Sequence, residues 1–139
     1  MQRYQGLYQI CNGGDGMINY ITDLMDVIDK VTEDILVTTT YPDTNIVPIV
    51  ILYESDQTGI YRCSEYEHAS STVIIEIYAK DIPTRNKLKN NVDLAMQDLH
   101  FELVKKEDID NDPIYASKLT YQCEVLQIEG SVQIYNKKY

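Results

Sequence analysis

The sequence predicts one α+β domain: a mixed, mostly antiparallel sheet with two amphipathic helices packed on one face. Two observations support this prediction. Two segments repeat apolar residues at steps of three and four, the period of a helix with one buried side, whereas other segments are β-prone or alternate apolar and polar residues, the period of a strand. The order is helix, strands, helix, strands, and a sheet with one apolar face gives both helices a surface to cover. A chain of 139 residues can bury such a core as a single domain.

The first helix is predicted from an apolar stripe close to the start of the chain. Asp15 is placed to cap this helix, because its carboxylate can accept hydrogen bonds from the free amides of the first turn. Residues 1–15 are predicted to be a lead-in or arm, and residues 16–139 to form the domain. The stripe consists of Met17, Ile21, Leu24, Ile28, Val31 and Ile35.

A strand is predicted over residues 46–54, after a break at residues 38–45 that contains proline and turn-forming residues. Pro48 has no amide hydrogen to donate, so it indicates an edge position or the start of this strand. Residues 55–59 are predicted to form a turn. Residues 60–71 are polar and ambiguous, and they fit a hairpin arm with a flexible tip.

The most β-prone segment is residues 72–80, and it leads directly into the second predicted helix. Asp81 and Pro83 mark the start of that helix. The strand is expected to turn Val73, Ile75, Ile77 and Ala79 to one face, and the helix to bury Leu88, Val92, Ala95, Met96 and Leu99.

The last part of the chain is predicted to be a connecting loop followed by two strands. The loop is the acidic segment 107–113, and a short final strand covers residues 131–135 after Gly130. The longer strand before it has one wet face, since Leu119, Tyr121, Cys123 and Val125 alternate with Lys118, Thr120, Gln122 and Glu124.

The charge of the chain is unevenly distributed. Up to Glu76 there are 12 acidic and 3 basic residues, whereas from Ile77 onward there are 10 acidic and 9 basic residues. A chain with a net charge of −10 is a poor candidate for gripping phosphates, which are bound by lysine and arginine. It can still surround DNA without holding it, because like charges repel, and ordinary solubility explains the charge equally well.

Composition gives little support to metal, cofactor or membrane chemistry. The three cysteines, Cys11, Cys63 and Cys123, have no C-x-x-C spacing, and only His68 and His100 could add ligands. We therefore expect reduced thiols, with Cys123 in the core, and no bound metal or cofactor. The chain has no long apolar run and no signal-like start, so we expect it to be cytosolic when made.

No catalytic signature is present, so we expect no catalytic residues and no enzyme. The histidines lie in no known catalytic motif, and the glycine-rich segment 11–17 lacks the lysine of a phosphate loop. Asp108, Asp110 and Asp112 alternate like the start of a calcium loop, but Pro113 stands where such a loop needs glycine. A small metal- or ligand-binding domain that uses residues 108–112 remains an alternative.

Two features point to surfaces between proteins. Of 13 aromatic residues, 12 are tyrosine, which is enriched at interfaces, although strand propensity also favours it. The second helix begins with Arg85, Lys87 and Lys89, and basic residues at this end oppose the helix dipole by on the order of 0.3–1 kcal/mol each if exposed. They could face Asp23, Asp26 and Asp29 of a neighbouring copy in a head-to-tail ring, or be a small uncompensated cost.

The layout resembles the tail terminator proteins of long-tailed bacteriophages, which are also called tail-completion or head–tail joining proteins. The resemblance covers most of the chain from about Gly16 to Tyr135 and is one of pattern and order, with no diagnostic motif. It runs from the stripe Met17–Val31 through "PIVILYE", "STVIIEIYAKD", "RNKLKNNVDLAMQDL" and "HFEL" to "YASKLTYQCEVLQ".

The resemblance implies a structural virion protein with no catalysis. Such a protein forms a six-fold ring at the head-proximal end of the tail tube, ends tube polymerisation and joins tail to head, while DNA passes through the lumen without specific binding. Its partners would be further copies of itself, the tail-tube protein and a head-completion or neck protein. The region from Ser55 to His68 would contact the tube or a neighbour, and its candidate interface residues are Asp56, Tyr61 and Tyr66. A related neck or head-completion adaptor is the alternative within the same class.

Overall fold

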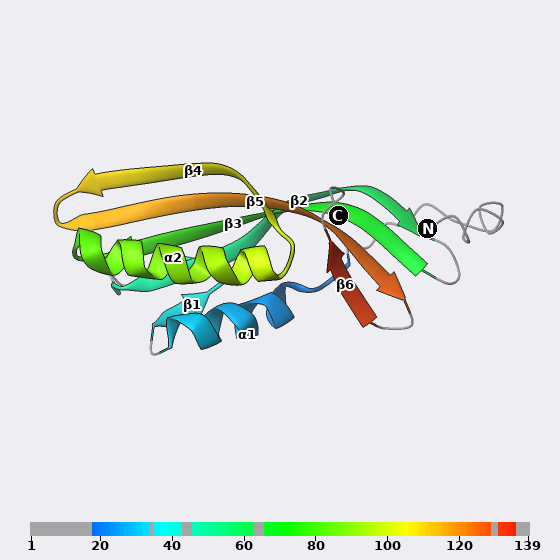
Figure 1. Ribbon diagram of the computed structural model, residues 1–139, viewed down its shortest axis with the longest axis horizontal. Helices are drawn as coiled ribbons and strands as arrows, with labels where there is room; N and C mark the ends of the chain where they lie inside the picture. Colours follow the sequence, from blue (N-terminus) through cyan, green and yellow to red (C-terminus); the bar gives the residue numbers. More distant parts are fainter. Residues whose placement is uncertain (1–17, 34, 43–45, 63–65, 129–130, 136–139) are drawn as a thin grey trace.

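The computed structural model describes residues 18–33, 35–42, 46–62, 66–128 and 131–135. They form a single α+β domain with one mixed, mostly antiparallel sheet of six strands and two helices packed against it, as the sequence predicts (Figure 1). The elements are α1 (Ile21–Thr32), β1 (Leu36–Thr38), β2 (Ile49–Arg62), β3 (Tyr66–Ala79), α2 (Ile82–Asp98), β4 (Glu102–Asn111), β5 (Ile114–Ile128) and β6 (Ser131–Tyr135).

The strands lie in the order β1-β2-β3-β5-β4, and β6 also pairs with β5. Among the described strands, β1 and β2 form the one parallel pair, and the other pairs are antiparallel. In Figure 1, β4 and α1 lie at opposite edges of the elongated molecule, and both helices lie on the same side of the sheet. No helix of the described residues covers the other side of the sheet.

Helix α1 is shorter than the sequence predicts. It begins at Ile21 after Tyr20, whose side chain makes no capping bond, and it ends at Thr32 because Glu33 adopts a φ of 55°. Ile35 consequently lies beyond the helix, although it still packs against the core. The predicted cap Asp15 and the first stripe residue Met17 lie outside the described residues.

The predicted turn at residues 55–59 is wrong, because these residues belong to β2. Asp56, Gln57 and Thr58 pair with Thr72, Ser71 and Ser70 of β3. The pairing register shifts on both sides of this stretch, and Gly59 has a φ of 62°. The turn-forming residues that suggested a turn therefore produce bulges in the strand, and the chain does not reverse direction there. Residues 60–62 and 66–71 form the two arms of the β2–β3 hairpin, and the predicted flexible tip falls on residues outside the described ranges.

Helix α2 begins where the sequence predicts. The Asp81 carboxylate accepts a hydrogen bond of 2.7 Å from the Thr84 amide, and Pro83 lies in the first turn. Pro48 directly precedes Ile49, the first residue of β2, which agrees with its reading as a strand start. The strand predicted over residues 46–54 therefore begins three residues later than expected. The predicted stripe of α2 is buried at Leu88, Val92, Ala95 and Met96, and Leu99 is partly buried.

The acidic segment 107–113 is not a loop, which corrects the prediction. Its residues up to Asn111 belong to edge strand β4, and only Asp112 and Pro113 form the turn to β5. In β5 the alternation predicted for residues 118–125 is present on the core side. The opposite face is not wet throughout, because Glu124 is buried there and hydrogen-bonded to Ser70, and of the predicted wet residues Gln122 alone is exposed. Strand β6 occupies residues 131–135 as predicted.

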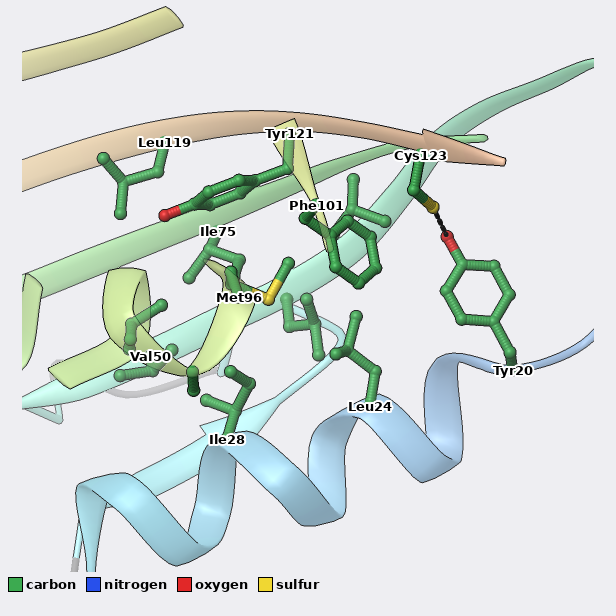
Figure 2. Packing of buried hydrophobic residues seen from close by; sticks show 14 of the residues in the cluster. Tyr20, Leu24, Ile28, Val50, Ile75, Met96, Phe101, Leu119, Tyr121 and Cys123 are labelled. Carbon is green, nitrogen blue, oxygen red and sulfur yellow. Dashed lines mark hydrogen bonds between the residues drawn. The ribbon is translucent and has the colours of Figure 1, made fainter. Parts of the chain in front are cut away.

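The core lies between the sheet and the two helices. Val73, Ile75, Ile77 and Ala79 of β3 are fully buried on the face that the sequence predicts. Figure 2 shows Leu24 and Ile28 of α1 and Met96 of α2 pointing toward Ile75 and the strands. Cys123 is buried in this core as predicted, and its burial raises the pKa of the thiol to about 12. None of the described helices is long and apolar enough to cross a membrane.

Candidate interaction surfaces

The side of the sheet that no described helix covers, here called the open face, is rich in tyrosine. Side chains alternate between the two faces of a strand, and Val73 and Ile75 of β3 lie on the helix side. The pairing register of the neighbouring strands with β3 therefore assigns each of their residues to one face. Tyr20, Tyr115 and Tyr121 belong to the helix side. The described tyrosines that belong to the open face are Tyr41, Tyr53, Tyr61, Tyr66, Tyr78 and Tyr135.

Glu76 of β3 lies at the centre of one tyrosine cluster on the open face. Its carboxylate accepts hydrogen bonds from the hydroxyls of Tyr41 at 2.6 and 2.7 Å, of Tyr53 at 2.7 Å and of Tyr78. Burial alone raises the pKa of this carboxyl, but the three donated hydrogen bonds, with Lys118 nearby, outweigh burial and hold the pKa below its ordinary value. Glu76 is therefore a buried carboxylate that the fold keeps charged.

A second polar cluster lies nearer the β2–β3 hairpin. Ser70 donates a hydrogen bond of 2.7 Å to Glu124, and His68 Nε2 lies 3.4 Å from the other oxygen of that carboxylate. The Tyr135 hydroxyl is 2.8 Å from the same nitrogen, so this cluster ties β6 to β3. Each of these side chains has a structural partner, and the serine does not contact the histidine as a nucleophile would its base.

The residues predicted to contact a tube or neighbour through the Ser55–His68 region have unequal exposure. Asp56 is exposed on β2. Tyr61 is half-buried and Tyr66 is buried. The centroids of their two rings lie 5.7 Å apart. These two rings belong to a small apolar cluster with Leu126, so most of their surface is used within the chain.

The acidic residues predicted on the first helix form an exposed row. Asp23, Asp26 and Asp29 all lie on the solvent side of α1, opposite the buried Leu24 and Ile28. The row is therefore accessible to a partner, as the ring hypothesis requires.

The basic residues at the start of α2 are mostly paired within the chain. Arg85 is buried, bonds Asp110 and lies 3.7 Å from Asp108, and Lys89 lies 3.0 Å from Asp108. A hydrogen bond from Ser117, together with Lys89 and Arg85, holds the pKa of Asp108 below its ordinary value. The charges of Arg85 and Lys89 thus have partners on β4 and need no neighbouring copy. Lys87 differs: it is exposed, and it forms no ion pair with another described residue.

The same ion pairs account for the acidic segment 108–112. Asp108 and Asp110 point to the cations of α2, and Asp112 is exposed in the turn. Within the described ranges, no three His, Cys, Asp or Glu side chains are grouped as a metal site would require.

Two adjoining hollows lie along the seam between α1 and α2. One, of about 450 Å³, is lined by apolar residues such as Val27 and Ala95 and bordered by Leu94, whose exposed fraction of 62% is unusually high for a leucine. The second, of about 340 Å³, has Val31, Ile35 and Leu88 in its walls and Lys87 at its rim. We call the second one the seam hollow.

A third hollow, of about 230 Å³, opens on the other side of the sheet. It lies between Tyr78, Ile49 and the connection that contains Tyr41 and Ile46, and its lining is mainly apolar.

The features that were not predicted from the sequence include the Glu76 cluster and the exposure of Leu94. The Glu76 cluster had a signal, since a lone carboxylate interrupts the most apolar strand, "TVIIEIYA". The exposure of Leu94 also had a signal, because this residue falls outside the stripe of α2 that is predicted to be buried.

Comparison of the chain with models of protein families and with curated proteins finds no match.

Proposed function

We propose that this chain is a ring-forming structural protein of a long-tailed bacteriophage: a tail terminator that ends tail-tube polymerisation and joins the tail to the head. The observation that carries the proposal is the order of elements. An N-terminal helix, a strand from Ile49, the strand Tyr66–Ala79, the helix Ile82–Asp98 and the long strand Ile114–Ile128 follow one another as in the pattern on which the resemblance rests.

The exposed surfaces support a role in assembly. The open face is rich in tyrosine, a residue that suits protein interfaces, and α1 exposes its row of aspartates. In this proposal the acidic first half of the chain keeps the lumen non-adhesive, so DNA passes without specific binding. The finished protein is part of the virion, in the tail or neck, after synthesis in the host cytoplasm.

The functional test is the capping of tail tubes. Purified protein is added to the polymerising tail-tube protein of the same phage, and tube lengths are measured by electron microscopy. A terminator shortens the tubes and is seen at one end of each. Tubes of unchanged length without a cap would reject the terminator.

A neck or head-completion adaptor is the second candidate, because such a protein would share the ring and differ only in the surface it meets. It would bind the head connector and leave tube length unchanged.

The metal-binding alternative receives less support, because Asp108 and Asp110 already pair with Arg85 and Lys89. A rise in melting temperature on adding calcium, in a protein that stays monomeric, would favour this alternative over the ring.

A further inference from the structure

We propose that the turn between β4 and β5 of one copy docks in the seam hollow of the next copy, with Asp112 facing Lys87. This inference rests on the proposed ring, because it names the contact between neighbouring subunits. It gives a role to two side chains that form no ion pair within the described part of the chain. One is Lys87, which differs in this from Arg85 and Lys89 in the first turns of α2. The other is Asp112 in the exposed turn.

The turn has the shape and charge of an inserting element. Asn111, Asp112 and Pro113 are all exposed at its tip, and Ile109 next to them has an exposed fraction of 48%. Figure 1 shows the β4–β5 turn at one extreme of the long axis, so it can reach a second molecule. While Asp108 and Asp110 are held by α2, Asp112 forms no ion pair with another described residue.

The seam hollow has complementary properties. Its apolar walls, which include Val31, Ile35 and Leu88, can cover the Pro113 ring, and Lys87 supplies a cation at the rim on the α2 side. Glu33 stands on the α1 side of the same hollow. This arrangement fixes the orientation, because an acidic tip is attracted to the α2 wall and repelled by the α1 wall.

The turn and the hollow are different surfaces of the same chain. A contact made in one direction around successive copies is heterologous, and its repetition generates a ring when the rotation closes; the reciprocal contact within one pair would instead close a dimer, and a dimer mass would overturn the proposed ring. The occupant of the hollow is thus a second copy, and the geometry agrees with the head-to-tail assembly that the proposed function needs.

Charge reversal tests the contact. Lys87→Glu and Asp112→Lys each replace an attraction of about 0.2–1 kcal/mol with a repulsion of similar size. We therefore expect subunit association to weaken by about 2- to 30-fold per contact at low salt. The double variant Lys87→Glu/Asp112→Lys should recover assembly. An equimolar mixture of the two single variants should also assemble, since each hollow then meets a turn of opposite charge. Lys106→Glu, an exposed reversal on the middle of β4, is the control and should assemble normally.

Oligomer mass by light scattering or mass photometry separates the outcomes. Rings that form equally well with either single reversal, or single variants that are not rescued by mixing or by the double change, would overturn the docking and leave the ring intact. A wild-type chain that is monomeric at every concentration would overturn the docking and the proposed ring together.

Discussion

The two faces of the sheet bury different kinds of side chain. On the helix side, aliphatic residues such as Ile75 and Ile77 are sealed by α1 and α2. On the open face the same strand places Ile74, Glu76 and Tyr78, and the tyrosine hydroxyls satisfy the buried carboxylate. Tyrosine allows this because one end of the side chain is apolar and the other can donate a hydrogen bond. The sheet therefore has one face buried under the helices and one tyrosine-rich face on which hydroxyl groups bind the buried carboxylate.

The largest expected difference between the faces lies in neighbouring isoleucines of β3. Ile75→Ala removes a fully buried side chain and should lower the free energy of unfolding by about 2–5 kcal/mol. Ile74→Ala removes a half-buried side chain from the open face, and roughly 1 kcal/mol is expected. Chemical denaturation of both variants measures the contrast. Equal losses would show that the open face is packed as tightly as the core, for instance by a second subunit.

A smaller effect is expected at the ion pairs between α2 and β4. The double variant Asp108→Asn/Asp110→Asn leaves the buried Arg85 without its carboxylates and should destabilise the fold by about 1–3 kcal/mol; the loss is moderated because both aspartates are partly solvated. The matched control is Asp26→Asn on α1, which should be close to neutral. If the double variant unfolds like wild type but no longer assembles, Arg85 belongs to an interface after all.

The smallest expected effect is at Glu76, and it depends on pH. The folded pKa of Glu76 lies below its ordinary value, so its contribution to stability is present above the unfolded pKa and is lost as the pH falls through the folded pKa. Glu76→Gln should therefore cost about 1–2 kcal/mol at neutral pH and progressively less in acid. Denaturation of both proteins from pH 7 downward provides the measurement. A difference that stays constant, or grows in acid, would exclude this role for the carboxylate.

Most helices and strands could be predicted because their residues repeat with the period of one buried face. Strand β3 and helix α2 are the clearest cases, with Val73 to Ala79 alternating and Asp81 capping the helix. The errors in the sheet, which are the predicted turn at residues 55–59, the predicted loop at residues 107–113 and the missed strand β1, have physical reasons. Gly59 is typical of a turn, but here it lies at an irregularity within β2. Strand β4 shows no apolar alternation, because it is a mostly exposed edge strand. β1 was missed because three residues are too few to show a period.

The candidate surfaces were less predictable than the fold. The acidic row of α1 could be predicted from spacing alone, because its residues share one helix. The partners of Arg85 could not, since Asp110 lies 25 residues away and reaches it only through the packing of α2 on β4. The sequence does place an excess of basic residues at the start of α2. Carboxylates on β4 of the same chain pair with most of them.

The central claim, that the chain assembles into a ring of identical subunits, is tested most directly by imaging the purified wild-type protein by electron microscopy together with its mass in solution. We expect closed rings with six-fold symmetry and the mass of a hexamer at low salt. A protein that remains monomeric across the whole concentration range, with no closed particles in the images, would contradict it.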